Sequence, residues 1–329
     1  MAEPILEARD LHTYFFTKEG TIKAVRGVSF RLEPGQVLAI VGESGCGKTT
    51  LALSLLRLVP FPGKILRGEV WFSGQNLLNL DDENLRRLRG QAISMIFQDP
   101  VSGLNPVLPI GKQVEEILMS HLDVPKKERR RRTLEILRSV GLADAERIAE
   151  SYPFHLSGGM CQRVMIAMAT ALNPSVIIAD EPTSALDVTV QAQILHELDT
   201  LRRTRGTAIL LITHDLGVVA QMADEVAVMY AGSFIEQGSV TQVYRQPRHP
   251  YTWSLLATRP RLDGAPGPLH AIPGAPPNMA ELPEECAFLP RCPKAISRCR
   301  VEPAPPLAPF GVQGQRVACY NPVFHDWEG

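Results

Sequence analysis

Short apolar runs alternate with longer amphipathic stretches over the first 245 residues of the chain. Three of these runs, residues 36–42, 175–180 and 208–214, are apolar at nearly every position. Such runs predict strands that are buried on both faces of a parallel sheet. Strands that alternate with helical segments are typical of an α/β fold. The pattern therefore predicts an α/β core whose inner strands include these three runs.

This pattern changes at two places along the chain. Between about residues 99 and 163 the strand-like runs disappear while helical periodicity continues, so we expect an inserted helical subdomain. Sixteen of the 27 prolines lie from Pro247 onward, where they disfavour helices and inner strands. The predicted domains are a core (residues 1–98 and 164–245), a helical subdomain (99–163) and an irregular C-terminal region (246–329).

Composition and charge narrow the class of protein. The chain has 329 residues, of which 45% are hydrophobic and 21% charged, as in an ordinary globular protein. Its net charge of -1 gives no general attraction to nucleic acid. No apolar run approaches the roughly 20 residues of a membrane span, and an acidic residue, Glu3, near the start argues against a signal peptide. We expect a cytosolic protein that meets a membrane only through a partner.

The segment GESGCGKT, residues 42–49, matches the pattern G-x-x-x-x-G-K-[ST] and is called the P-loop below. It follows a predicted strand and opens a predicted helix, so its backbone N–H groups and the helix N-terminus can bind phosphate. Lys48 can reach the β- and γ-phosphates, and Thr49 offers a hydroxyl to Mg²⁺. The residues expected to bind nucleotide here are Gly42, Ser44, Gly45, Cys46, Gly47, Lys48, Thr49 and Thr50.

An acidic pair ends another predicted strand, in the segment VIIADEP. Asp180 would deliver a carboxylate to the metal beside the P-loop. Glu181 would polarise the water that attacks the γ-phosphate, although by itself it could equally be a surface acid at a strand end.

The segment LSGGMCQR, residues 156–163, resembles the signature of the ATP-binding cassette (ABC) ATPases, LSGGQ followed by a helix. Met160 stands where glutamine is usual. The resemblance extends to FQDP with Gln98, SALD at residues 184–187 and ITHD with His214, all in the family's order. It implies a P-loop NTPase (RecA-like) core with an N-terminal antiparallel β subdomain and a helical subdomain, which hydrolyses ATP with Mg²⁺.

The resemblance also implies that two cassettes pack head to tail, so that the signature of one chain completes the ATP site of the other. The donors of Ser157, Gly158 and Gly159 at a helix N-terminus suit an anion in the same way. The implied catalytic residues are Glu181, His214, Gln98 and Lys48. The implied Mg²⁺ ligands are Thr49, Gln98 and Asp180, while Phe15 would stack on adenine and Asp187 would cross the dimer interface.

Cys46 in the P-loop has two interpretations. It can be a small side chain that fits the loop. Alternatively, its thiol has a lowered pKa beside Lys48 and a helix N-terminus, which predicts maleimide labelling that ATP blocks.

Four cysteines, Cys286, Cys292, Cys299 and Cys319, occur late in the chain with the spacing C-x5-C-x6-C-x19-C. Disulfides are not expected in a reducing cytosol. Structural zinc usually takes paired C-x2-4-C ligands, which this spacing lacks. Four separate thiolates suit a [4Fe–4S] cluster, with Zn²⁺ or free thiols as alternatives. We therefore expect a small metal-binding C-terminal domain.

The segments RHPYTWSLL (residues 248–256) and FQDPVSGLNP (97–106), with the late cysteines, resemble ATPase subunits of dipeptide and oligopeptide importers. Nickel importers have overlapping motifs, and a soluble ABC protein without transport is the alternative from another class. The resemblance implies a [4Fe–4S] site, a second ATPase subunit that is expected to be a paralogue, two membrane permeases and an extracytoplasmic binding protein. It places the chain at the cytoplasmic face of a bacterial membrane. The cargo is not encoded in this chain.

Overall fold

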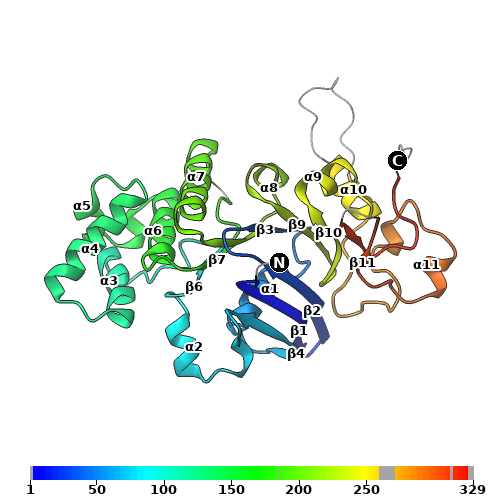
Figure 1. Cartoon of the computed structure of the whole chain (residues 1–329), viewed down its shortest axis with the longest axis horizontal. Coiled ribbons are helices and arrows are strands. Elements are labelled where there is room, and N and C mark those ends of the chain that lie inside the picture. Colours follow the sequence, from blue (N-terminus) through cyan, green and yellow to red (C-terminus); the bar gives the residue numbers. More distant parts are fainter. Residues whose placement is uncertain (1–2, 185, 259–270, 312–313, 325–329) are drawn as a thin grey trace. The chain divides into compact units, whose positions relative to one another are not determined.

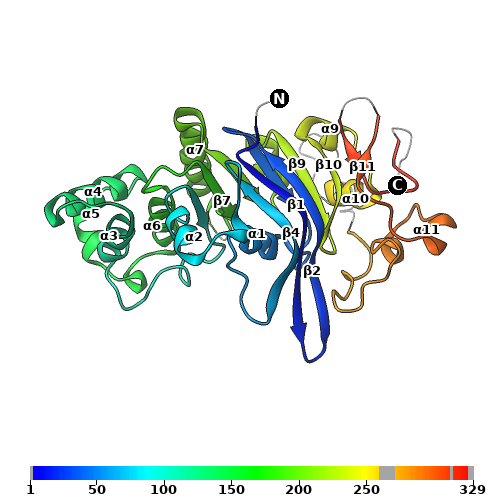
Figure 2. The ribbon, with the colours of Figure 1, turned by 60° about the horizontal axis from the view of Figure 1, so that its bottom comes forward.

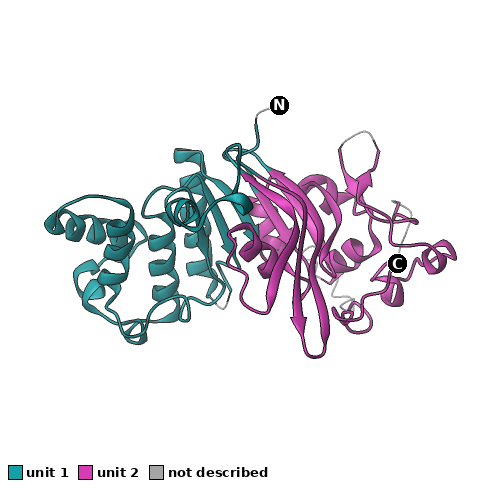
Figure 3. Ribbon diagram, turned by 90° about the horizontal axis from the view of Figure 1, so that it is seen from below, with its two compact units in different colours: residues 1–6, 32–37, 72–212 teal, residues 7–31, 38–71, 213–329 magenta. Residues whose placement is uncertain are grey.

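A computed structural model of the chain describes residues 3–184, 186–258, 271–311 and 314–324. The chain forms two compact units (Figure 3). Unit 1 comprises residues 1–6, 32–37 and 72–212, and unit 2 comprises residues 7–31, 38–71 and 213–329. The domain bounds expected from the sequence stay a prediction.

Unit 1 contains three short parallel strands, β6 (Ile93–Ile96), β7 (Val176–Asp180) and β8 (Ala208–Ile212). β7 pairs with β6 on one side and with β8 on the other. Every residue of the three strands is buried, as expected for apolar runs that have neighbours on both faces. The strand predictions for residues 175–180 and 208–214 are therefore confirmed.

The inserted segment of unit 1 is helical. Residues 99–163, all of which are described, contain helices and turns but no strand. In Figures 1 and 2, the three helices α3, α4 and α5 gather together, and α6 lies between them and the strands β6 and β7. The bounds are α3 (Ile110–His121), α4 (Lys126–Ser139), α5 (Ala145–Glu150), the 3-10 helix η2 (Pro153–His155) and α6 (Gly158–Thr170).

The remaining elements of unit 1 flank this arrangement. The long helix α7 (Val188–Arg205) connects β7 to β8 and ends at Gly206, whose positive φ of 68° favours glycine. A short strand β5 (Gln75–Asn76), the 3-10 helix η1 (Leu77–Asn79) and α2 (Asp82–Leu88) precede β6.

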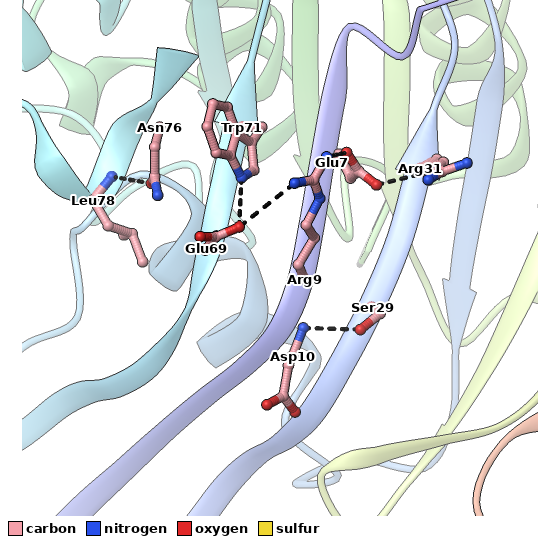
Figure 4. A network of polar contacts seen from close by, with 9 residues as sticks. All are labelled: Glu7, Arg9, Asp10, Ser29, Arg31, Glu69, Trp71, Asn76 and Leu78. Carbon is pink, nitrogen blue, oxygen red and sulfur yellow. Dashed lines mark hydrogen bonds and ion pairs between the residues drawn. The ribbon is translucent and has the colours of Figure 1, made fainter. Parts of the chain in front are cut away.

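Unit 2 begins with three long strands, β1 (Leu6–Thr17), β2 (Gly20–Leu32) and β4 (Gly63–Phe72), in the order β2–β1–β4 (Figure 2). On one face, the nearly buried carboxylate of Glu7 accepts hydrogen bonds from Arg9 and Arg31 (Figure 4). The hydrogen bond from Arg9 is the main cause that lowers the pKa of Glu7. The antiparallel β subdomain implied by the family resemblance is present.

The rest of unit 2 is built on a second sheet. β3 (Val37–Val41) pairs in parallel with β9 (Glu225–Tyr230), and β10 (Ser233–Ser239) pairs with β9 in antiparallel. β12 (Arg316–Val317) continues this sheet beyond β10, followed by β11 (Ala308–Pro309). The helices are α1 (Lys48–Leu55), α8 (Leu216–Met222), α9 (Val240–Arg245), α10 (Pro250–Ala257), η3 (Leu289–Arg291) and α11 (Arg298–Val301).

The C-terminal region shares the hydrophobic core of unit 2. Tyr251 of α10 and Phe288 are fully buried and pack with Val228 and Tyr230 of β9. Residues 271–279 of the proline-rich stretch form no helix or strand, as predicted, while residues 259–270 lie outside the described residues. The region is thus irregular in backbone, yet its aromatic side chains complete the core beside β9.

Candidate functional site

The P-loop follows β3 and leads into α1 within unit 2. A Cβ atom added at Gly42 would lie 2.2 Å from the Met229 carbonyl oxygen, and one added at Gly47 would lie 2.0 Å from the Ala24 carbonyl oxygen. Gly47 also has a φ of 108°, which side chains rarely allow. Glycine is therefore required at both positions for the tight turn that directs backbone N–H groups toward phosphate.

Lys48 extends into this loop. Only 6% of the residue is exposed, and Nζ donates hydrogen bonds to the carbonyl oxygens of Gly42 at 2.8 Å and Glu43 at 3.0 Å. The neighbouring Thr49 is exposed at the start of α1. The loop thus combines the ammonium group of Lys48, the exposed side chain of Thr49 with its hydroxyl, and a helix N-terminus. These are the donors that bind phosphates in such loops.

The lowered pKa proposed for the Cys46 thiol is wrong. Cys46 is buried, with 6% exposed. Burial raises the pKa of its thiol, and the attraction of the thiolate to Lys48 offsets this only in part. The side chain is a small group that fits the inner side of the loop.

We accordingly expect Cys46 to react slowly with maleimide, and at similar rates with and without Mg-ATP, because a buried thiol is protonated at neutral pH. Mass spectrometry of digested protein after timed labelling measures this rate. Protein labelled after denaturation provides the control for full reactivity. Fast labelling of the folded protein that ATP suppresses would restore the reactive-thiol interpretation.

In unit 1, three predicted motifs meet at the end of β7. Gln98 Nε2 donates a hydrogen bond to Glu181 Oε2 at 3.1 Å, although the two residues are 83 positions apart. The Ser184 hydroxyl donates to the Gln98 carbonyl oxygen at 3.4 Å. Asp180, the last residue of β7, is buried with 1% exposed. The structure thus brings the predicted water-activating carboxylate of Glu181 and the side-chain amide of Gln98, a predicted Mg²⁺ ligand, into direct contact.

Glu181 has an unusual backbone conformation. Its φ is 48°, in the left-handed region that residues other than glycine rarely adopt. Its N–H donates to the Ile212 carbonyl oxygen at 2.8 Å, which holds the turn after β7 in place. Strained residues of this kind gather at functional sites. The conformation fixes where the carboxylate leaves the end of the strand.

The signature segment forms the N-terminus of α6. Ser157 is the N-cap, and its hydroxyl oxygen accepts a hydrogen bond from the Met160 N–H at 3.3 Å. A Cβ atom added at Gly158 would meet no described atom within 4 Å. The first turn of α6 therefore presents N–H donors with open space beside Gly158, as an anion site requires.

Gln162 is a residue that the sequence reasoning missed. It lies on α6 with 2% exposed, and its Nε2 donates to the Pro182 carbonyl oxygen at 2.7 Å. It thereby ties the signature helix to the segment that follows Glu181. The sequence did contain a signal for this contact: Gln162 is the one side-chain amide on a largely apolar helix. A buried polar side chain requires a hydrogen-bond partner, so such an amide predicts a contact.

The remaining predicted site residues are divided between the two units. Asp187 is the N-cap of α7, where its carboxylate accepts a hydrogen bond from the Val190 N–H at 3.0 Å. His214 is exposed two residues after β8, and Phe15 is half-buried on β1. Phe15, His214 and the P-loop belong to unit 2, whereas Gln98, Asp180, Glu181, the signature and Asp187 belong to unit 1. Their joint action on one nucleotide is a proposal.

The four late cysteines, Cys286, Cys292, Cys299 and Cys319, line one pocket in unit 2. Burial is the main cause that raises the pKa of Cys292 to about 11 and of Cys319 to about 12, and the other thiols add to both shifts. All six cysteines of the chain lie among the described residues and are free. In the described part of the chain, no group of three or more His, Cys, Asp or Glu could hold a metal ion. The expected metal-binding domain is therefore not confirmed.

Fold and motifs together define a P-loop ATPase of the cassette type. The family described as "ABC transporter" matches residues 25–184, and the family described as "Oligopeptide/dipeptide transporter, C-terminal region" matches residues 235–299. The chain belongs to the oligopeptide and dipeptide family of ABC transporter ATP-binding subunits.

Three of its relatives match over at least 90% of their own length. The chain is 48% identical to a probable peptide ABC transporter ATP-binding protein of Sinorhizobium fredii, and the alignment covers 97% of this chain and 96% of that protein. It is 46% identical to the oligopeptide transport ATP-binding protein OppD of Escherichia coli, over 98% of this chain and 94% of that protein. A dipeptide transport ATP-binding protein of Bacillus subtilis is 47% identical, over 92% of this chain and 90% of that protein.

Solved structures give the same assignment of fold. A dimeric ATP-binding cassette in a post-hydrolysis state with ADP and Pi aligns with a TM-score of 0.65 and 31% identity. That alignment covers 71% of this chain and 98% of the cassette. Among the described residues, no helix is long and apolar enough to cross a membrane.

Proposed function

We propose that this chain is the ATP-hydrolysing subunit of an importer for dipeptides or oligopeptides. The observation that carries the proposal is similarity over at least about nine-tenths of the chain to oligopeptide and dipeptide transport ATP-binding proteins. The family that matches residues 235–299 is described as a region of oligopeptide and dipeptide transporters, and this similarity supports peptide over nickel as the cargo of the importer.

Two cassettes form the functional ATP sites in this proposal. The P-loop of one chain holds the triphosphate, and Ser157, Gly158 and Gly159 of a second cassette donate hydrogen bonds to the γ-phosphate. The open first turn of α6 supports this role, as does the dimeric state of related solved cassettes. Asp187, the N-cap of α7, would face the second cassette, and Phe15 would stack on adenine.

Within each site, Glu181 accepts a proton from the attacking water while the side-chain amide of Gln98 holds the carboxylate in position. His214 and Lys48 donate hydrogen bonds to the γ-phosphate as its charge develops. Thr49, Gln98 and Asp180 offer the oxygen ligands that Mg²⁺ prefers, so the residues fit this ion. When bound, Mg²⁺ neutralises phosphate charge. Loss of the γ-phosphate removes the contacts between the cassettes and lets them separate.

The proposed assembly contains a second ATPase subunit that is a paralogue, two membrane permeases and, indirectly, an extracytoplasmic peptide-binding protein, without nucleic acid. The chain would lie peripherally at the cytoplasmic face of a bacterial membrane. A tagged chain purified from detergent-solubilised membranes should recover the permeases and the second ATPase. The recovered complex in vesicles should take up peptide with ATP. Recovery without permeases, or uptake of nickel but no peptide, would contradict the proposal.

We further propose that the four late cysteines bind a [4Fe–4S] cluster, with Zn²⁺ as the alternative. Their shared pocket supports a common ligand. A four-iron cluster is larger than one ion and takes one thiolate from each cysteine, so it fits thiols that surround a pocket without forming a site for a single ion. Burial, and to a smaller extent the neighbouring thiols, raises the pKa of Cys292 and Cys319, and a bound cation would offset this cost of forming thiolates.

Anaerobically purified protein is expected to be brown, with absorbance at about 400 nm, and to contain about four iron atoms per chain. Elemental analysis and the visible spectrum measure this. Replacement of Cys292 by serine should reduce the iron content and the colour, whereas replacement of Cys161, which lies on α6 in unit 1, should leave both unchanged. Stoichiometric zinc without iron would overturn the cluster assignment.

A further inference from the structure

Glu43, the second residue of the P-loop, makes two contacts with the C-terminal region. Its carboxylate accepts hydrogen bonds from the Arg291 guanidinium, at 2.7 Å from Nη1 and 2.9 Å from Nη2. Its backbone N–H donates to the Tyr251 hydroxyl at 2.8 Å. These partners are 248 and 208 positions away in the sequence. A segment outside the ATPase motifs therefore contacts the phosphate-binding loop directly.

Arg291 is held firmly. Its side chain is only 5% exposed, and Nε donates to the Pro273 carbonyl oxygen at 2.9 Å while Nη1 also lies 3.2 Å from the Tyr230 hydroxyl. The guanidinium lies 6.0 Å and 5.9 Å from the ring centres of Tyr230 and Phe288. Since a guanidinium is planar and its donors have fixed directions, this arrangement holds the Glu43 carboxylate in one orientation.

Tyr251 is fixed by a second set of contacts. It is fully buried near the start of α10, and its N–H donates to Nδ1 of His249 at 3.0 Å. Burial lowers the pKa of His249 to about 3, so the imidazole is neutral and Nδ1 remains an acceptor. The buried Glu236 carboxylate accepts from the N–H groups of Arg248 and His249 at 2.7 Å and 2.8 Å. The hydroxyl that meets Glu43 therefore has a set position.

The same loop residue also contacts the lysine expected to bind the phosphates. Lys48 Nζ donates to the Glu43 carbonyl oxygen at 3.0 Å, and the nearby Cys46 carbonyl oxygen accepts from the Gly232 N–H at 2.9 Å. Glu43 is thus restrained through its carboxylate, its N–H and its carbonyl oxygen. A loop whose conformation is already restrained by such hydrogen bonds loses less conformational freedom when it binds a ligand, which favours binding.

We propose that Arg291 and Tyr251 are positioning residues that hold the P-loop in its phosphate-binding shape through Glu43, so that the C-terminal region sets nucleotide affinity. The inference rests on nucleotide binding by the P-loop, as in the proposed function. It assigns the C-terminal region an effect on ATP binding that is separate from any role in cargo or metal binding. Neither residue touches the nucleotide in this proposal, so the chemical step itself should be little affected.

The test compares ATP affinity with turnover in the full-length chain. Arg291→Ala should raise the Kd for a fluorescent ATP analogue about tenfold, because it leaves the loop without its bidentate partner. Turnover at saturating ATP should stay within about threefold of wild type. In a Glu43→Gln background, the same Arg291→Ala change should alter Kd less than about threefold, because the ionic contact is already weakened. Tyr251→Phe, which removes only the hydroxyl, should raise Kd about threefold.

Arg298→Ala is the matched control, since Arg298 forms an exposed pair with Glu302 in the same region. It should leave Kd unchanged. A folded Arg291→Ala chain with the Kd of wild type would overturn the inference, as would an equal loss of affinity in both backgrounds. If Arg291→Ala does not fold, unchanged affinity in both Glu43→Gln and Tyr251→Phe overturns it. Failure of the proposed function looks different: the wild type would not bind ATP, or Lys48→Ala would bind it equally well.

Discussion

Replacement of Glu181 by glutamine should slow ATP turnover by about 10²- to 10⁴-fold, the usual range for loss of a general base. ATP binding should survive, because the amide is nearly the same size as the carboxylate. The amide oxygen of the variant can also accept the hydrogen bond that Gln98 Nε2 gives to Glu181 Oε2. The change therefore removes the proton acceptor while keeping the geometry at the end of β7. Turnover and the Kd for ATP are measured on the same preparation.

Glu135→Gln provides a matched control, because Glu135 is an exposed carboxylate paired with Arg131 on α4. It should leave turnover unchanged. Gln98→Ala should lower turnover less than Glu181→Gln does, because the carboxylate remains but loses the contact that holds it. A Glu181→Gln variant that hydrolyses ATP within a few fold of wild type would remove the catalytic role from Glu181.

The second large effect is expected at Gly158, where replacement by aspartate should lower turnover by at least about 10²-fold. A side chain has open space there in the single chain, and an acidic residue in the first turn of a helix stabilises it by about 0.3–1 kcal/mol. The thermal stability of the chain should therefore be unchanged or slightly higher. In the proposed dimer, the same carboxylate would stand against the γ-phosphate, and like charges repel.

Lys127→Asp is the control for charge at a helix N-terminus, because Lys127 is exposed in the first turn of α4. It should retain most of the ATPase activity. The specific activity of the wild type should also fall when the chain is diluted below the concentration at which two cassettes associate. Full turnover by Gly158→Asp, or a specific activity that is independent of concentration down to the monomer, would refute the shared ATP site.

Much of the candidate site was predictable because its motifs are local. The P-loop, the acidic pair after residue 179 and the signature each combine a few adjacent residues with a strand or a helix, and such elements show in the apolar pattern. What each motif contacts was not predictable. The Gln98–Glu181 hydrogen bond joins two segments that the helical insert separates, and the Gln162 contact with Pro182 depends on how α6 packs.

The Cys46 pKa shows the limit of reasoning from sequence neighbours. Lys48 and the start of α1 favour the thiolate, and both are visible in the sequence. The fold buries Cys46, whose carbonyl oxygen accepts a hydrogen bond from the Gly232 N–H just after β9. The cost of burying the charged form exceeds the attraction of the thiolate to Lys48 and the helix start, so the pKa rises. Burial depends on segments nearly 200 residues away, which the local pattern does not contain.

By itself, the sequence determined the class of protein, the strands of the core, the helical insert and the motifs expected to meet phosphate, because these follow from short-range order along the chain. Only the tertiary structure decided which distant groups meet: Glu181 with Gln98, and Glu43 with Arg291 and Tyr251. These contacts form because packing of the core removes polar groups from water. A polar group that is buried without a hydrogen-bond partner is costly, so each of these groups pairs with another.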